Sequence, residues 1–313
     1  RMIVPMVKGF LVEGDTPVTF AWRWGVETVN GPYNQGDPKF FKMSVHLEWS
    51  ERWLNYSWTR ENLMLESAAK YIFLRDNFGM PTDLAGMATV VNNKYGKLLE
   101  IKQNVAYANR VTPVLMDVSK PREAMEFFNI LMPQGYRMVL VDVKDVPPGM
   151  MERFEYVMVD DASQAAGYPG KTVFVLKEAD DPEVREEQGM VMVNVPYLRY
   201  TNQLFYHGDI ANGYMWNGWD AWPGARINAS MKAVLLKAGV SMTNYVNKLD
   251  YTPVSFTRVN DNRIKLGNSA GFTLVKESYF PYWESPGDEV ISTSQGFMLV
   301  YSGEGESELA YRK

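Results

Sequence analysis

Four short runs of β-branched and other apolar residues recur at regular spacing between residues 111 and 176, at 111–118, 137–142, 156–160 and 172–176. A helical stripe at 123–131 separates the first two runs; Ser119 is its expected N-cap, and Pro121 lies near its first turn. Short apolar strands that alternate with helical segments are typical of a parallel sheet covered on both faces. The sequence therefore predicts a small Rossmann-like α/β unit over residues 112–187.

A different pattern follows the charged stretch at 180–187. Strand candidates are frequent and short, and turn sequences at 260–262 and 267–269 separate several of them. Such spacing predicts an antiparallel, jelly-roll-like β-sandwich over residues 188–313. The expected strands are 190–195, 197–205, 230–236, 254–259, 263–266, 271–279 and 297–301.

The first part of the chain, residues 1–111, reads as a mixed α/β segment. Its predicted elements are a strand at 17–24, a helix at 60–70, a strand at 71–75 and a hairpin at 90–105. A chain of 313 residues exceeds the size that one hydrophobic core usually supports. We therefore expect an α+β protein of several domains.

Bulk composition excludes several classes of function. The chain carries 37 acidic and 32 basic residues, a formal charge of −5, which disfavours a nucleic-acid partner. It has no cysteine, so disulfides and thiolate chemistry are excluded. No long apolar run indicates a membrane span. Because the sequence opens with Arg1 and enters structured sequence at once, we expect a fragment of a longer protein.

The predicted α/β unit carries no phosphate-binding motif. Its glycines do not form the spacing that cradles a dinucleotide or a nucleoside triphosphate, so we expect no cofactor. Asp160 and Asp161 follow a predicted strand at the edge where parallel sheets bind ligands. They have two interpretations, a ligand contact or the capping of a turn, and the sequence favours capping.

The most concentrated aromatic stretch of the chain is Tyr214-Met-Trp-Asn-Gly-Trp-Asp-Ala-Trp-Pro223. Aromatic residues dominate buried area, so packing is one interpretation of this stretch. Its Gly and Pro residues instead favour a loop, and a loop holding three Trp favours contact with a ligand, partner or membrane surface. The candidate ligand-binding residues are His207, Tyr214, Trp216, Trp219, Asp220 and Trp222.

Neither catalysis nor metal binding has a strong sequence signal. His207 lies near Asp209 and Asp220, but the spacing is not that of a calcium loop, so we predict no metal site. Glycoside hydrolysis needs two facing carboxylates, and Glu48, Asp220 and Glu284 are the possible members because each lies beside aromatic residues. A hydrolase or transferase therefore stays an alternative, as does a structural cell-surface interaction domain. No catalytic residue is assigned.

Two N-x-[ST] triplets, at Asn55 and Asn228, weakly favour an exported location.

The closing segments resemble a known membrane-protein family. Gly271-Phe-Thr-Leu-Val-Lys-Glu-Ser-Tyr-Phe-Pro-Tyr-Trp283, 296–300 and 306–311 are similar to the last module of the 6-pyruvoyl-tetrahydropterin synthase-related polytopic membrane proteins. These proteins are akin to C-type glycosyltransferases and YfhO-like proteins. Tyr33-Asn-Gln-Gly-Asp-Pro38, His46-Leu-Glu-Trp49 and residues 62–75 resemble its first extramembrane segment. The resemblance touches about a third of the chain.

The resemblance implies a bundle of transmembrane helices before Arg1 and a position outside the cytoplasm. No catalytic residue carries over, because the family's catalytic acid lies in loops between transmembrane helices. The zinc-binding histidines of the pterin synthase are unmatched, so no pterin chemistry is expected. The resulting hypothesis is a non-catalytic extracytoplasmic module that contacts a glycan or lipid-linked sugar, with the membrane region of the same polypeptide as its partner.

The closing motif also has a physical interpretation. Phe272, Leu274, Tyr279 and Phe280, with Val300 opposite, are expected to fill one face of a sandwich, while Trp283 covers its edge. Most of this motif is then scaffold.

Overall fold

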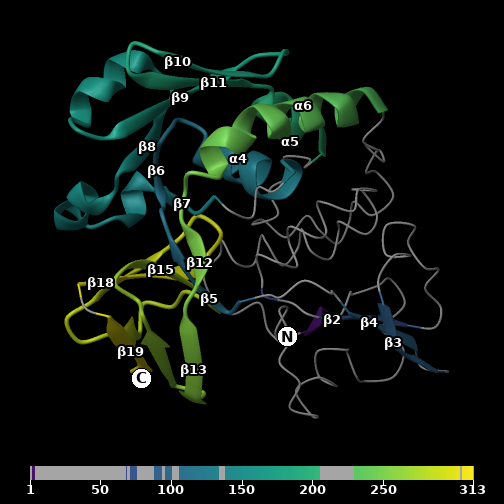
Figure 1. Cartoon of the computed structure of the whole chain (residues 1–313), viewed down its shortest axis with the longest axis vertical. Coiled ribbons are helices and arrows are strands. Elements are labelled where there is room, and N and C mark those ends of the chain that lie inside the picture. Colours follow the sequence, from purple (N-terminus) through teal and green to yellow (C-terminus); the bar gives the residue numbers. More distant parts are fainter. Residues whose placement is uncertain are drawn as a thin grey trace, which may run out of the picture.

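The computed structural model describes residues 2–3, 68, 71–75, 88–93, 96–100, 106–133, 138–204, 229–303 and 305–312. Within these ranges the chain is a mixed α+β protein whose strands form four sheets and whose helices are few (Figure 1). The predicted strand at 17–24 and, apart from Ala68, the predicted helix at 60–70 lie outside the described residues.

The first sheet contains β1 (Met2–Ile3), β2 (Tyr71–Arg75), β3 (Ala88–Asn93) and β4 (Gly96–Glu100), in the order β1-β2-β4-β3. β3 and β4 form an antiparallel hairpin, and β4 also pairs with β2. The strand predicted at 71–75 and the hairpin predicted around Asn92 and Asn93 are therefore confirmed.

The second sheet is mostly parallel. Its order is β10-β11-β9-β8-β6-β7, and only the edge strand β10 runs antiparallel to its neighbour. The predicted runs of β-branched residues supply four of these strands, and the boundary expected at 187 falls inside the sheet. The strands are β6 (Val114–Asp117), β7 (Leu140–Asp142), β8 (Tyr156–Val159), β9 (Thr172–Glu178), β10 (Glu183–Glu187) and β11 (Met190–Val195).

Short helices connect the parallel strands. α4 (Pro121–Glu126) continues into a π-helical turn, η2 (Phe127–Leu131), which confirms the predicted helical stripe. The expected capping role of Ser119 is wrong, because Lys120 occupies the N-cap and no side chain caps this helix. Pro121 starts it, since its fixed φ suits the first turn and that position needs no N–H donor. The later connections are the 3-10 helices η4 (Val143–Asp145), η5 (Pro148–Arg153) and η6 (Ala162–Gly167).

Two segments predicted as strands, 197–205 and 230–236, are helices: α5 (Tyr197–Leu204) and α6 (Ala229–Val246). α6 is rich in Ala, Leu, Met and Lys, which favour helix. Its buried residues Leu235, Ala238, Met242 and Val246 recur at helical spacing. The strand prediction failed because a short apolar run does not distinguish a strand from a buried helix. α4, α5 and α6 gather on one side of the parallel sheet (Figure 1).

Gly239 sits where α6 crosses the end of the η2 segment. A Cβ at this position would lie 2.9 Å from Cδ of Pro133 and 3.1 Å from its Cγ. Glycine therefore permits an approach that any larger residue would disturb.

Two antiparallel sheets complete the fold. One has the order β12-β5-β15-β18-β17 and the other the order β13-β14-β19-β16. Both sheets contribute to one hydrophobic cluster, which includes Val275 and Met298 of the first and Ile264 and Leu309 of the second. The strands are β5 (Ala108–Val111), β12 (Tyr251–Pro253), β13 (Ser255–Asn260), β14 (Arg263–Gly267), β15 (Gly271–Ser278), β16 (Trp283–Glu284), β17 (Glu289–Ser292), β18 (Phe297–Ser302) and β19 (Glu306–Tyr311).

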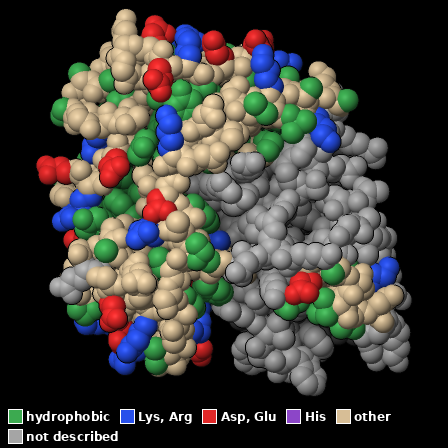
Figure 2. All heavy atoms as spheres, in the orientation of Figure 1, with side chains coloured by type: hydrophobic (Ala, Val, Ile, Leu, Met, Phe, Trp, Pro, Cys, Tyr) green, Lys and Arg blue, Asp and Glu red, His purple; other side chains and the backbone are tan. Residues whose placement is uncertain are grey.

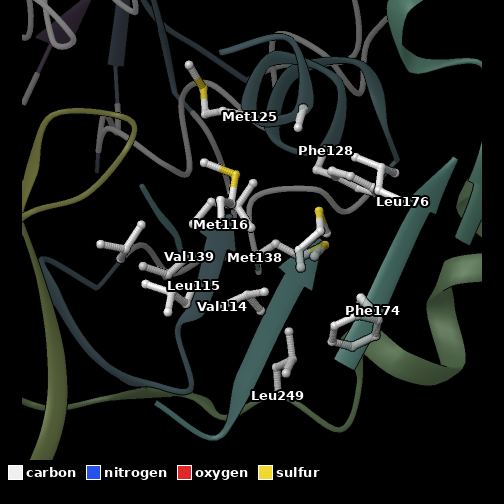
Figure 3. Packing of buried hydrophobic residues seen from close by; sticks show 14 of the residues in the cluster. Val114, Leu115, Met116, Met125, Phe128, Met138, Val139, Phe174, Leu176 and Leu249 are labelled. Atoms are coloured by element: carbon white, nitrogen blue, oxygen red, sulfur yellow. The ribbon is translucent and has the colours of Figure 1, made fainter. Parts of the chain in front are cut away.

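The five-stranded sheet is buried on both faces. Phe272 and Leu274 belong to the large core shared with the parallel sheet, part of which is drawn in Figure 3, whereas Val275 and Val300 belong to the cluster between the antiparallel sheets. The expectation that Phe272 and Leu274 pack opposite Val300 is therefore wrong. Alternate residues of a strand point to opposite faces, so one strand serves two cores.

The single strand predicted at 111–118 is two strands in different sheets, β5 and β6. Pro113 lies between them, and proline cannot donate a ladder hydrogen bond. β5 pairs with β12, where Val111 faces Tyr251. Beside this pair, the Thr112 N–H donates to the Asp250 carbonyl at 3.1 Å, and the Asp250 N–H donates to Thr112 Oγ1 at 3.0 Å. The chain thus leaves the five-stranded sheet at Val111 and returns on the neighbouring strand.

Candidate functional site

The carboxyl edge of the parallel sheet is one candidate site. β6 lies between β7 and β8, so the chain leaves it toward one neighbour and later returns to the other. Ligands of open parallel sheets bind outside the carboxyl ends of the strands at such a reversal. Asp117 ends β6, and Asp160 follows the last residue of β8.

The carboxylates at this edge accept hydrogen bonds from the loops around them. Asp160 Oδ2 accepts from the Ser119 N–H at 2.5 Å, and Asp117 Oδ2 accepts from the Tyr168 hydroxyl at 2.8 Å. The first bond ties the loop after β6 to the end of β8. The second ties η6 to β6, so both aspartates hold the edge together.

Asp161 and Gln164 form a capping box at the start of η6. Asp161 Oδ1 accepts from the Ser163 N–H at 2.8 Å, while Gln164 Oε1 accepts from the Asp161 N–H at 2.8 Å. The preference for turn capping over ligand contact, predicted from the sequence, is therefore confirmed for Asp161. The hydrogen bond from Ser163 holds the pKa of the Asp161 carboxyl below its usual value, so this cap is charged at neutral pH.

A fourth carboxylate organises the start of α5. Glu178 ends β9 and accepts from the backbone N–H groups of Leu198 at 2.8 Å and Arg199 at 3.3 Å. Arg199 in turn pairs with Asp180 at 2.7 Å. An acidic side chain at a helix N-terminus satisfies free donors and interacts favourably with the helix dipole.

Two tyrosines near this edge are held in their neutral form. Burial, and then the hydrogen bond to Asp117, raise the pKa of Tyr168 to about 12. Burial, and then the charges of Asp160, Glu178 and Glu123, raise the pKa of Tyr197 to about 12. Both phenols are therefore hydrogen-bond donors throughout the physiological pH range.

No three His, Asp or Glu side chains within the described ranges come close enough together to hold a metal ion. Among the helices of the same ranges, none has the length and apolar content that crossing a bilayer requires.

All six ligand-binding candidates predicted from the sequence lie in 205–228, outside the described residues; they are His207, Tyr214, Trp216, Trp219, Asp220 and Trp222. Glu48 and the sequon residues Asn55 and Asn228 also lie outside them. Glu284 is described: its carboxylate pairs with Arg312 Nη1 at 2.9 Å, and 52% of its side chain is exposed. It stands on the outer surface of the four-stranded sheet.

That outer surface holds a feature that the sequence interpretation missed. Strand pairing places Ala310 of β19 between Glu284 of β16 and Arg263 of β14. Glu308 lies two residues before Ala310 on β19, so it shares the face of Ala310, and Arg312 directly follows β19 and pairs with Glu284. These five residues are named the Ala310 face.

Ion pairs link the long side chains of the Ala310 face. Arg263 Nε lies 3.0 Å from Glu308 Oε1, which complements the Glu284–Arg312 pair. Lys265 approaches the same carboxylate at 3.5 Å. The alternation of charged and apolar residues in Arg263-Ile-Lys-Leu266 and Glu306-Ser-Glu-Leu-Ala-Tyr-Arg312 is the signal that could have revealed this face.

Aromatic rings pack around Tyr311, the residue next to Ala310 on β19, whose side chain points to the opposite face of the sheet. Tyr282 is 58% exposed, and its carbonyl accepts a 3.0 Å hydrogen bond from the Arg312 N–H. Its ring meets that of Tyr311 edge to face, with centroids 5.9 Å apart, and Phe280 and Trp283 also pack around Tyr311. Trp283 is buried in the cluster between the antiparallel sheets, whereas Tyr282 is open to solvent.

Comparison with known proteins returned no family model, no curated protein and no solved structure that matches this chain.

Proposed function

We propose that this chain is a non-catalytic extracytoplasmic module of a glycosyltransferase-like membrane protein, and that it contacts a glycan or a lipid-linked sugar. The membrane region of the same polypeptide would be its partner. The proposal combines the resemblance of the closing segments with the residues of the aromatic stretch at 214–222.

The observation that carries the proposal is the place of this aromatic stretch in the chain. The described fold stops at Leu204, the end of α5, and resumes at Ala229, the start of α6. The 214–222 stretch therefore lies between these two helices in the sequence. Its Gly and Pro residues favour a loop, loops commonly carry binding residues, and flat aromatic faces suit the C–H surface of a sugar.

The carboxyl edge of the parallel sheet supports a binding role over bond cleavage. Asp117, Asp160 and Glu178 each accept hydrogen bonds that fix neighbouring loops or helices. A general acid or base must reach a substrate proton. These carboxylates instead hold neighbouring loops and a helix N-terminus in place.

The same proposal includes the finer features of the fold. The order β7-β6-β8-β9 with parallel pairing matches the order 2-1-3-4 of doubly wound sheets, which favours a Rossmann-like unit. The hydrophobic cluster that the two antiparallel sheets share favours a β-sandwich. A jelly-roll-like path through that sandwich stays a prediction.

Saccharide binding tests the proposal directly. The chain is screened against immobilised glycans, and the best-bound soluble oligosaccharide is titrated by calorimetry. Replacing Trp216 and Trp219 with Ala should weaken binding about tenfold or more, because ring stacking contributes over 1 kcal/mol in such contacts. Trp216→Phe is the control that keeps a flat ring. Absence of binding by the unmodified chain, or equal affinity of the double Ala variant, would refute the proposal.

A further inference from the structure

We infer that β3 is an interaction strand, through which two copies of the chain pair edge to edge in antiparallel orientation. The inference goes beyond the proposed glycan contact and concerns the first sheet alone. Figure 1 shows β3 at the edge of that sheet, and Figure 2 shows hydrophobic side chains at the surface in the lower right of the view, where the sheet lies.

Among the described residues, β3 has a strand on one side only. All its ladder partners lie on β4, from Glu100 opposite Ala88 to Gly96 opposite Asn93. The sheet order β1-β2-β4-β3 therefore leaves the other side of β3 as an edge. The backbone N–H and C=O groups along such an edge are a template for pairing with another extended chain. The chemistry of the edge thus specifies a β-strand as its partner.

The side chains of β3 favour such pairing. Thr89, Val90, Val91 and Asn92 are four consecutive exposed residues, and a bulge falls between Thr89 and Val91. Val90 is 50% exposed and Val91 is 43% exposed. β-branched residues fit the pleated, half-buried surface of a sheet. A strand added to this edge would cover part of both valines.

The other sheet edges within the described ranges carry protection that β3 lacks. Four of the five residues of β10 are charged, β13 contains Arg258, β17 contains Glu289, and β12 contains Pro253. The turn before β18 covers β7, since the Ser294 N–H donates to the Leu140 carbonyl at 2.8 Å. β1 and β16 have only two residues each. Charge, proline, covering and short length all hinder edge-to-edge pairing.

The composition of β3 favours a second copy as the partner. Its sequence, Ala-Thr-Val-Val-Asn-Asn, carries no charge, so two copies meet no like-charge repulsion across the contact. Pairing centred on Val91 sets this residue opposite its own copy, where the two β-branched side chains can pack. A strand of another protein would be selected by complementary charges, and β3 offers none.

The symmetry of the contact limits its size. Antiparallel pairing of a strand with itself is two-fold, so it uses the same edge of both copies and closes as a dimer. The six residues of β3 span about 20 Å. A contact of this length is smaller than a standard protein interface, so we expect a weak dimer with a Kd on the order of 0.1 mM.

The test is sedimentation equilibrium of the 313-residue chain between about 10 μM and about 1 mM. Val91→Lys and Val91→Glu each set like charges opposite each other, so each should weaken dimerisation about tenfold. An equimolar mixture of the two variants should restore the dimer, because Lys then faces Glu. Since Val91 is exposed, the melting temperature of each variant at the lowest concentration should match that of the unmodified chain.

Val259→Lys is the matched control. Val259 is 47% exposed and also lies on an edge strand, β13, directly after Arg258. This variant should dimerise as the unmodified chain does. Hydrogen exchange gives a second measurement: the β3 amides that point away from β4 should exchange more slowly at high concentration of the unmodified chain, and this slowing should be lost in Val91→Lys.

A chain that stays monomeric at about 1 mM would overturn the inference and leave β3 to a strand of another protein. A dimer that both Val91 variants retain would also overturn it, because the contact would then lie elsewhere, and so would a mixture that fails to restore the dimer. Restoration by the mixture, together with an unaffected Val259→Lys, supports it. None of these results depends on saccharide binding, so the proposed function is tested separately.

Discussion

Replacement of Gly239 by Ala sets two effects of similar size against each other. Alanine in place of glycine within a helix favours folding by about 1 kcal/mol. The new methyl group would lie 2.9 Å, 3.1 Å and 3.3 Å from three ring carbons of Pro133, closer than carbon atoms normally approach. Overpacking of this kind costs about 1–3 kcal/mol.

The steric cost should win, because the obstacle is a proline ring at the end of a helical segment and cannot swing aside as a long side chain would. We expect Gly239→Ala to lower the free energy of unfolding by about 1 kcal/mol and the melting temperature by roughly 2–4 °C. Differential scanning calorimetry measures both.

A double-mutant cycle isolates the contact. Pro133→Ala removes the ring, so Gly239→Ala in that background should stabilise the chain through helix propensity. Asn244→Ala, on the exposed side of the same helix, is the control for propensity alone. A rise in melting temperature for Gly239→Ala in the otherwise unmodified chain would contradict the steric reasoning.

Three further perturbations address the carboxyl edge and its supports. Lys171→Met should lower the free energy of unfolding by about 1–3 kcal/mol in urea titration, because the ammonium donates to three backbone carbonyls at the end of η5; Lys177→Met, at an exposed position, should have little effect. Asp161→Ala should cost about 0.5–2 kcal/mol through loss of the capping box, and an unchanged urea midpoint would refute that role. Tyr197 has a folded-state pKa of about 12, above its usual 10, so its stabilising contribution is complete below pH 10 and is lost as pH rises through 12. The melting temperature should therefore fall less steeply between pH 8 and 12 for Tyr197→Phe than for the unmodified chain.

Local sequence signals predicted a strand well where turn residues on either side marked its ends. β8 and β9 follow from compact β-branched runs, and the β3–β4 hairpin was predicted from Asn92 and Asn93, which are the last two residues of β3. α5 and α6 were missed because apolar content alone does not distinguish the period of a strand from that of a helix. For α6, helix propensity and the spacing of Leu235, Ala238, Met242 and Val246 were the local signals that could have revealed it.

The candidate site was harder to predict than the fold. Asp161 could be assigned to capping because a cap is a local interaction within a few residues. The Ala310 face depends on which strands are neighbours. Glu284 and Arg263 are brought to either side of Ala310 only by the pairing of β16 and β14 with β19. No periodicity within one strand encodes that arrangement.

The hydrogen-bonded contact between Thr112 and Asp250 has a consequence for biosynthesis. The five-stranded sheet cannot close β5 against β12 until the intervening chain exists, and Arg110 and Asp250, which form an ion pair across this junction, are 140 residues apart. At ribosomal rates of about 5–20 residues per second, β5 waits roughly 7–28 s for its partner. During that interval the strand edge is unpaired, while the parallel-sheet unit emerges complete and can fold first. Once this unit is folded, it holds the chain ends that carry β5 and β12 near each other. The parallel-sheet unit thereby assists the later assembly of the five-stranded sheet.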